Sequence, residues 1–414
     1  DVATHLTHTH PLQGLCSKPP GSARARTWNN TLRMRPLAHL CPLDCRVLSR
    51  KRPRALTLQQ GNLFYSNAER LRKEARNLND LHIAIRLFLA ILLNVPSRAR
   101  ELRSRSRERL ILLLCQRDDH DPLAAHLLRR GGFICRLSPA VLRYHESETS
   151  APESPPPPEL AHAVDSALAP GLLRSLQTAF APGSPFWSEH AYACGSSPFF
   201  SYVHPLDVAP RIGFERVLGA LHAIACKHFP RARAARYVEW WAHCRPHGVG
   251  HQLHFDSDKE GEGGLRHPLV SSALYLTGGI GGPTLVTEQR MGQPLSKRGW
   301  MVTPHENRYL LFDGRVLHGV VPGNGPVAHD GGVAEGSERR RISLMVAFWP
   351  AIEQHSSYVQ PGAARPFPVT AALGKPTSDS AVPPVWELAP LAAERPLHSV
   401  QSMPEYDECF QGLC

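Results

Sequence analysis

The sequence predicts a mainly β fold, a sandwich or barrel of short strands with flanking helices, preceded by a basic N-terminal region that is partly helical or disordered. Two observations predict this class. Short segments in the second half of the chain are rich in aromatic and β-branched residues, and Gly, Pro or Asp residues that favour turns separate them. No segment with helical periodicity lies between these strands, as it would in a protein built on a parallel sheet.

In the N-terminal third, the apolar run at residues 81–95 predicts a buried helix. The run is interrupted by His82 and Arg86 and is shorter than the ~20 residues that a membrane-spanning helix needs, so we expect no transmembrane segment. The Arg-rich stretch that follows, at residues 98–109, is consistent with the charged face of a helix or with a flexible arm, and the helix face is favoured.

Further along the chain, residues 159–180 predict a helix, and residues 214–225 predict an amphipathic helix. In the second segment apolar residues recur three and four positions apart, which favours packing of one face on a sheet. We expect strands at residues 237–241, 270–276, 283–286, 308–312, 318–321 and 342–349.

Composition divides the chain into five segments. They are a basic arm or transit-peptide-like segment at 1–60, a basic helical region at 61–145, a Pro-rich linker at 146–158, the β domain at 159–350 and a Pro-rich tail at 351–414. The formal net charge is +11, but residues 1–145 hold 26 Lys and Arg against 10 Asp and Glu, whereas the remainder is slightly acidic. This asymmetry argues against nucleic acid as the ligand of an active site in the β domain.

Two features bear on the compartment of the protein. The segment from Met34 is rich in Arg and poor in acidic residues, as a plastid or mitochondrial transit peptide is, although a disordered basic arm of a cytoplasmic protein fits equally well. The ten cysteines include no Cys-x-x-Cys pair, which favours reduced thiols over a disulfide scaffold or a zinc ribbon. Cys409 and Cys414 could pair or remain free.

A candidate metal site is formed by His254, Asp256 and His318. In an extended strand residues i and i+2 point to the same side, so His254 and Asp256 can reach one point. Two His and one carboxylate leave half of an octahedron open, which is the arrangement of non-haem Fe(II) oxygenases. The alternative ligands are His243, His247, His251, His267, His305, His329, Asp258 and Asp313, none of which has this spacing in a strand.

The order of the motifs resembles that of the 2-oxoglutarate/Fe(II) dioxygenase superfamily, and the spacing is most similar to its prolyl-4-hydroxylase-like branch. The motifs are His254-Phe255-Asp256, Tyr275-Leu276, Gly281-Gly282-Pro283-Thr284, His318-Gly319-Val320 six residues after Phe312, and Arg341-x-Ser343. The likeness covers roughly residues 185–350.

This resemblance implies a double-stranded β-helix (jelly-roll) core in which His254, Asp256 and His318 hold Fe(II), with no catalytic residue beyond these ligands. Arg341 would bind the C5 carboxylate of 2-oxoglutarate through its planar fork, with Tyr275 or Ser343 as a hydrogen-bond donor. The implied reaction consumes O₂, releases succinate and CO₂ and hydroxylates a C–H bond of a small-molecule or peptidyl substrate, with ascorbate as an optional reductant.

Several alternatives remain open at this stage. The branch often carries Lys where this chain has Arg341, and 23 positions separate Arg341 from His318, so Arg339 and Arg340 are alternative anchors. Arg341 is favoured because it shares one strand face with Ser343. The alternative functions are a nucleic-acid demethylase of the same superfamily, whose Arg-x-Asn-x-x-x-Arg strand is absent from residues 341–349, and a non-catalytic binding or scaffold protein that retains the fold.

Overall fold

The computed structural model describes most of the chain between residues 55 and 354. The described residues are 55–117, 123–124, 126–127, 139–144, 156–190, 201–210, 212–258, 266–293, 296, 298–327, 339–354, 364–366 and 400–402. The chain forms two compact units, Asp1–Arg54 with Gly292–Leu295, and Ala55–Met291 with Ser296–Cys414. All the helices and strands described below lie in the second unit. The expected transit-peptide-like segment and the Pro-rich tail lie largely outside the described residues.

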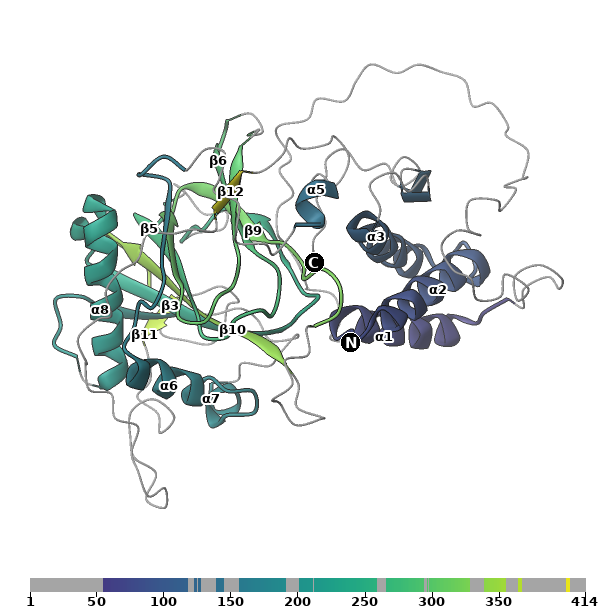
Figure 1. Ribbon diagram of the computed structural model, residues 1–414, viewed down its shortest axis with the longest axis horizontal. Coiled ribbons are helices and arrows are strands. Elements are labelled where there is room, and N and C mark those ends of the chain that lie inside the picture. Colours follow the sequence, from purple (N-terminus) through teal and green to yellow (C-terminus); the bar gives the residue numbers. More distant parts are fainter. Residues whose placement is uncertain are drawn as a thin grey trace. The chain divides into compact units, whose positions relative to one another are not determined.

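The larger of two sheets, the major sheet, has seven strands in the order β1-β8-β5-β10-β3-β2-β11 and is antiparallel except for the pair β11 and β2. Figure 1 labels its strands β3, β5, β10 and β11. Its strands are β1 (Ala161–Val164), β2 (Ser201–Pro205), β3 (Tyr237–Pro246), β5 (Val270–Tyr275), β8 (Tyr309–Asp313), β10 (Arg340–Trp349) and β11 (Ala364–Pro366). The long strand β10 lies between β3 and β5, with Ser343 paired to both His243 and Tyr275.

The second sheet, the minor sheet, has five antiparallel strands in the order β12-β7-β6-β9-β4. These strands are β4 (His251–His254), β6 (Thr284–Arg290), β7 (Gly299–Val302), β9 (Val316–Val320) and β12 (Val400–Ser402). The two sheets are consistent with a core of the double-stranded β-helix type. With its helices the molecule is mixed α/β, so the expectation of a mainly β fold underestimates the helical part.

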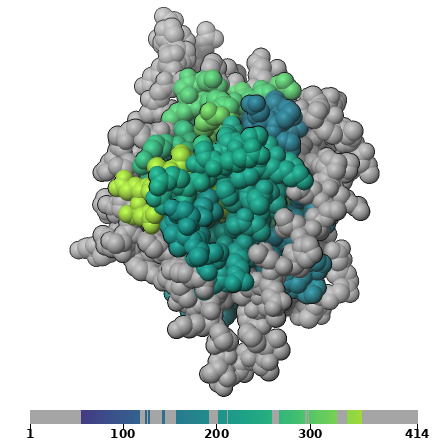
Figure 2. Space-filling model, turned by 90° about the vertical axis from the view of Figure 1, so that its left-hand side faces the viewer, coloured from purple at the N-terminus to yellow at the C-terminus, as the bar shows by residue number. Residues whose placement is uncertain are grey.

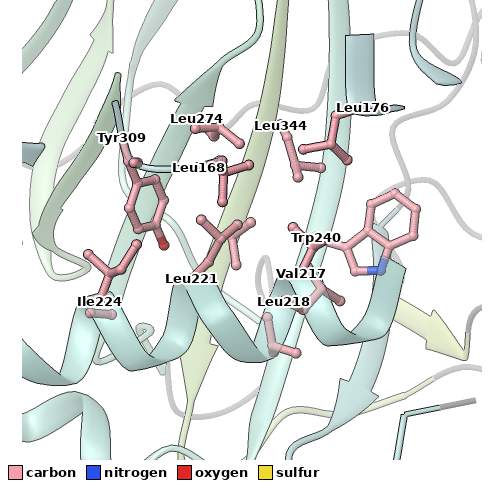
Figure 3. Packing of buried hydrophobic residues seen from close by; sticks show 14 of the residues in the cluster. Leu168, Leu176, Val217, Leu218, Leu221, Ile224, Trp240, Leu274, Tyr309 and Leu344 are labelled. Carbon is pink, nitrogen blue, oxygen red and sulfur yellow. The ribbon is translucent and has the colours of Figure 1, made fainter. Parts of the chain in front are cut away.

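The predicted amphipathic helix is α8 (Gly213–His228), which packs on the outer face of the major sheet together with α6 (Pro170–Ala179), α7 (Pro185–Glu189) and the short 3₁₀ helix η3 (Pro230–Ala234). Figure 3 shows Val217, Leu218, Leu221 and Ile224 of α8 facing Trp240, Leu274, Tyr309 and Leu344 of the sheet. Figure 2 views the molecule from this side, where the teal segment that contains α8 fills the centre of the face. Because successive strand residues alternate, the other face of β3 and β10 is turned inwards.

One expected element is wrong in part. Residues 159–180 do not form one helix: β1 pairs with β8 from Ala161 to Val164, and α6 begins only at Pro170. Proline lacks the backbone N–H that a helix interior needs but is well suited to the first turn, so Pro170 sets the start of the helix.

The N-terminal region folds into helices α1 (Leu58–Lys73), α2 (Leu78–Asn94) and α3 (Arg100–Arg117), with the short α5 (Pro139–Leu142). Thr57 and Gln60 form a capping box at the start of α1. The predicted buried helix is α2, and the Arg-rich stretch is the first half of α3, whose second half is buried. None of the helices in the described part of the chain is both long and apolar enough to cross a membrane.

These helices share one hydrophobic cluster with the minor sheet. Phe88 and Ile91 of α2 and the buried half of α3 belong to the same cluster as Leu285 of β6 and Met301 of β7. The helices therefore pack against β6 and β7 of the minor sheet. The five-part division of the chain stays a prediction, and the linker at 146–158 is described only at residues 156–158.

Candidate metal centre

The two candidate histidines are cross-strand neighbours. His254 ends β4 and is paired with His318 on the adjacent strand β9. Asp256 lies two residues beyond the end of β4. One ligand atom from each of the three side chains lies within 4.8 Å of the other two, and this is the single group of its kind in the described part of the chain. The structure thus brings together the three residues that their spacing predicted.

The side chains are oriented so that three ligand atoms converge. His254 Nε2 lies 3.4 Å and His318 Nε2 lies 3.6 Å from the same atom, Asp256 Oδ1. The opposite ring nitrogens face backbone carbonyls: His254 Nδ1 is 2.9 Å from the Gln252 oxygen and His318 Nδ1 is 3.1 Å from the Val316 oxygen. Because a carbonyl accepts only, each Nδ1 carries the proton and each Nε2 lone pair is directed at the centre.

The carboxylate is restrained from its other side. The Ser271 hydroxyl donates a hydrogen bond of 2.6 Å to Asp256 Oδ2, and His267 Nδ1 donates one of 2.6 Å to the Asp256 backbone oxygen. Sequence reasoning assigned no role to Ser271. Its position on β5, on the same strand face as Tyr275, was the available signal.

The protonation states suit metal binding. Burial lowers the pKa of His318 to about 4, although the nearby Asp256 carboxylate partly offsets the effect. Burial alone would raise the pKa of Asp256, but the His318 and His254 imidazoles and the Ser271 hydroxyl outweigh burial and hold that pKa well below its usual value. At neutral pH His318 is therefore neutral and Asp256 is ionised, as ligands must be.

The donor set fits Fe(II). Two imidazole nitrogens and one carboxylate oxygen on one side of a point occupy one face of an octahedron and leave the opposite face free. The His318 ring is packed against Phe312, with ring centroids 4.6 Å apart, whereas the His254 side chain keeps 33% of its surface exposed. The site is therefore rigid on one side and accessible on the other.

The predicted co-substrate anchor, Arg341, is buried on the inner face of β10. Its Nη1 atom lies 3.5 Å from the Gly282 oxygen, which is at the limit of a hydrogen bond. Burial lowers the pKa of Arg341 to about 10, so the guanidinium remains charged at neutral pH. Arg340 has the opposite orientation, and its Nη2 atom lies 3.5 Å from Oε1 of Glu74, the C-cap residue of α1. The predicted strand register is therefore the one in the structure, while the role of Arg341 stays a prediction.

Three polar side chains lie near Arg341, one on β10 itself and two on the strands β5 and β6. Ser343 is buried two residues along β10 and pairs with Tyr275 in the ladder. The Tyr275 hydroxyl lies 2.7 Å from Thr284 Oγ1 on β6, and burial raises the pKa of Tyr275 so that it stays protonated. Thr284 was part of the Gly-Gly-Pro-Thr motif but received no role from the sequence.

The inner face of β3 and β10 continues from Arg341 as an aromatic surface. Trp241, Ala347 and Trp349 form a small buried cluster there. The Trp349 Nε1–H donates a hydrogen bond of 2.8 Å to the Glu239 carboxyl, which also accepts one from the Ser201 hydroxyl. Burial raises the pKa of Glu239 to about 7 in spite of the hydrogen bond from Ser201.

The alternative ligands have other partners. Asp258 forms an ion pair of 2.6 Å with Arg266, and the buried Asp313 is surrounded by Arg231, Arg290 and Arg315. The remaining histidines fall into three groups: His243 and His251 are half-buried, and desolvation strongly lowers their pKa values; His247 and His267 bond to backbone groups; and His305 is exposed. His329 lies outside the described residues.

Comparison with known proteins gives a likeness in structure only. No family model and no curated protein matches the sequence. A prolyl 4-hydroxylase from Pseudomonas putida is 17% identical over 46% of this chain and 92% of its own, with a TM-score of 0.32. A prolyl 4-hydroxylase from Phytophthora capsici is 17% identical over 46% of this chain and 58% of its own, with a TM-score of 0.29. HygX from Streptomyces hygroscopicus, solved with nickel and 2-oxoglutarate, is 13% identical over 50% of this chain and 91% of its own, with a TM-score of 0.31.

At these identities an assignment of function depends on the geometry of the site itself. The chain matches prolyl 4-hydroxylases and another structure that holds 2-oxoglutarate over about half of its length at low identity, and it carries a His–Asp–His group able to hold a metal ion.

Proposed function

We propose that the protein is an Fe(II)- and 2-oxoglutarate-dependent dioxygenase that hydroxylates a C–H bond of a small-molecule or peptidyl substrate. The observation that carries the proposal is the orientation of His254, Asp256 and His318. Both Nε2 atoms face Asp256 Oδ1 while both Nδ1 atoms are engaged with backbone carbonyls. A chance cluster of surface side chains has no reason to fix both tautomers in this way.

The residues of the chain have distinct tasks in this proposal. His254, Asp256 and His318 hold the metal, and Ser271 keeps one oxygen of Asp256 directed away from it. When bound, Fe(II) together with 2-oxoglutarate and O₂ supplies the oxidising power for attack on a C–H bond. Arg341 neutralises the distal carboxylate of 2-oxoglutarate in a buried setting, where such a charge-assisted contact is strong.

The substrate would approach from the side where His254 is exposed, since 33% of this side chain is accessible. Trp241 and Trp349 are buried behind the site on the inner face of β3 and β10, with Glu239 held among them by two hydrogen bonds. This cluster is next to the metal site, because its member Ala347 pairs with Ser271, the partner of Asp256. Its apolar character supports an organic or peptidyl substrate rather than a polyanion.

The test is 2-oxoglutarate turnover by the full chain. Purified protein with Fe(II), O₂ and 2-oxoglutarate is expected to release succinate slowly without substrate, and faster when a screen of peptides and metabolites supplies one. His254→Ala should abolish succinate release. The control is His305→Ala, which changes an exposed histidine outside the cluster and should leave succinate release unchanged. Equal rates in His254→Ala and the wild type would refute the proposal, and absence of turnover in the wild type would favour the non-catalytic alternative.

A further inference from the structure

Three loops meet at His247, and the second of them packs on the Arg341 side chain. These loops are residues 247–250 before β4, residues 278–283 before β6 and residues 321–327 after β9. The Gly281 N–H donates a hydrogen bond of 3.0 Å to His247 Nδ1. In the third loop, the Gly323 N–H donates one of 3.0 Å to the His247 backbone oxygen. His247 therefore joins all three loops.

The contacts of these loops with Arg341 and with the His247 ring leave little free space. A Cβ added at Gly281, whose φ is +83°, would lie 2.8 Å from Arg341 Cδ. A Cβ added at Gly323 would lie 2.5 Å from Cδ2 of the His247 ring. The loop backbone is thus packed directly on both side chains. A shift of His247 would move Gly281, and Gly281 cannot move towards Arg341 without displacing the guanidinium.

The chemistry of the ring fixes its tautomer. A backbone N–H can only donate, so His247 Nδ1 must be the acceptor and the ring proton must reside on Nε2. That nitrogen faces the backbone oxygen of Asn324 at 3.4 Å. Burial lowers the pKa of His247, the Asn324 carbonyl partly offsets this, and the Arg341 charge lowers the pKa further, so the ring stays neutral.

The N-terminal helices hold the first of these loops. Arg72 of α1 donates a hydrogen bond of 2.7 Å from Nη1 to the Gly248 oxygen, and Glu69 fixes Arg72 through a buried ion pair of 2.8 Å. The Gly248 N–H in turn donates to the Lys73 oxygen at the end of α1, at 2.9 Å. The residue next to His247 is therefore bonded to the helix at both its backbone groups.

The same helical region also holds the third loop. Gln116 of α3 donates hydrogen bonds of 3.3 Å and 3.2 Å to the oxygens of Pro322 and Gly323. The Asn324 N–H donates one of 3.0 Å to the Tyr144 hydroxyl. A continuous chain of contacts thus runs from Tyr144 through Asn324 to His247, and from His247 through Gly281 to Arg341.

We propose that His247 is a positioning residue for the 2-oxoglutarate anchor and that the N-terminal helices clamp it in place. This inference rests on the proposed function, because it assumes that Arg341 binds the co-substrate. His247 itself would not contact 2-oxoglutarate. It holds the Gly281–Gly282 backbone that confines the Arg341 side chain, and α1, α3 and Tyr144 set the position of His247 from outside the sheets.

The experiment measures equilibrium binding of 2-oxoglutarate to the full chain by anaerobic calorimetry with Mn(II) in place of Fe(II). His247→Leu removes the acceptor of the Gly281 N–H and so frees the backbone that confines Arg341. It should raise the Kd of 2-oxoglutarate about tenfold. His247→Asn retains an acceptor oxygen near the position of Nδ1 and should recover most of the affinity. Affinity for Mn(II) should stay within about twofold of wild type in both variants.

A double-mutant cycle tests the link to the helices. Tyr144→Phe removes one oxygen atom and should raise the Kd about threefold, and its effect should not add to that of His247→Leu because both act through Asn324. Glu74→Gln is the matched control: it removes the negative charge that pairs with Arg340 but leaves this chain of contacts intact, and it should bind 2-oxoglutarate as the wild type does. Thermal unfolding of each variant verifies that it is folded.

The outcomes separate this inference from the proposed function. If Arg341→Ala loses 2-oxoglutarate binding while folded His247→Asn, His247→Leu and Tyr144→Phe variants bind as the wild type does, the positioning role is wrong and the proposed function stands. If the effects of His247→Leu and Tyr144→Phe add fully, the helices do not act through His247 and the clamp is wrong. If the wild type does not bind 2-oxoglutarate, or if Arg341→Ala binds it with the affinity of the wild type, Arg341 is not the anchor and that part of the proposed function is wrong.

Discussion

At the scale of single residues, the site depends on hydrogen bonds that orient ligands more than on the ligands alone. The Asp256 carboxylate has one oxygen directed at two imidazoles and the other bonded to Ser271. Such partners of metal ligands set the geometry before the metal arrives, and their loss commonly weakens metal affinity by about 10–100-fold. Ser271 is therefore expected to contribute to metal affinity although it is not itself a ligand.

Ser271→Ala should weaken Fe(II) binding about tenfold while the protein stays folded, since the carboxylate can then rotate away from the two imidazoles. The adjacent Ser272 is the control. It lies on the opposite face of β5 and bonds to the Val346 oxygen and the Tyr309 hydroxyl. Ser272→Ala should lower the melting temperature without changing Fe(II) affinity, as metal titration and thermal unfolding can establish. Equal Fe(II) affinity in Ser271→Ala and the wild type would contradict this role.

The second prediction at this scale concerns Arg341. A buried charge-assisted contact with a carboxylate contributes about 1.5–3 kcal/mol, so Arg341→Ala should raise the KM for 2-oxoglutarate at least ~10-fold. Arg341→Lys should recover part of the loss, because it keeps the charge but not the planar fork. Arg340→Ala should change the KM little, since Arg340 is directed towards Glu74. A large effect of Arg340→Ala alone would show that the strand register is wrong.

At the scale of elements, the loops between strands determine how the strand residues can act. Gly281 and Gly279 both have positive φ, +83° and +65°, but only Gly281 has the Arg341 side chain within 4 Å of an added Cβ. Substitution by alanine strains the backbone at both positions. Only at Gly281 would the added methyl group also displace the side chain of Arg341, the proposed anchor.

Gly281→Ala should therefore destabilise the protein by about 1–2 kcal/mol and also raise the Kd for 2-oxoglutarate. Gly279→Ala should destabilise the protein to a similar extent but leave that Kd unchanged. Denaturant unfolding gives the stability of each variant, and calorimetry gives its affinity for 2-oxoglutarate. A Gly281→Ala protein that is destabilised but binds 2-oxoglutarate normally would show that the loop does not confine Arg341.

The sequence predicted the elements near the site better than those far from it. Period-two alternation predicted that His254 and Asp256 reach one point and that Arg341 and Ser343 share a strand face. In the structure Asp256 lies beyond the end of β4 but still faces His254, and Arg341 and Ser343 are both buried on β10. Residues such as Ser271 and His247 act through contacts with segments distant along the chain, which no local pattern encodes. The four-residue strand β1 was missed because its apolar residues also suit the helix that follows it.

At the scale of the whole molecule, the main surprise is the N-terminal region. Its charge and composition are typical of an arm, yet α1 to α3 share a hydrophobic cluster with Leu285, Met301 and Val321 of the β core. The sequence of α3 does not reveal this packing, because its first half is Arg-rich although its second half buries almost every side chain. The helices therefore cover apolar surface that the core would otherwise expose.

Two truncations test this arrangement. Removal of residues 1–54 leaves all the described contacts of the helices in place and should preserve both folding and 2-oxoglutarate binding. Removal of residues 1–145 should expose Leu285, Met301 and Val321 and release the loops beside Arg341, giving aggregated protein or a large loss of 2-oxoglutarate affinity. Solubility, size-exclusion chromatography and calorimetry report these effects. A soluble 146–414 fragment with wild-type affinity would mean that the helices are dispensable.

Anaerobic titration of the full chain with Fe(II) is the sharpest test of whether His254, Asp256 and His318 hold the metal. The wild type should bind one equivalent. Asp256→Ala should lose at least ~100-fold in affinity, because it removes the single charged ligand, while remaining folded by circular dichroism. His305→Ala should bind as the wild type does. If folded Asp256→Ala protein binds one equivalent of Fe(II) with wild-type affinity, the metal is held elsewhere and these three residues are not its ligands.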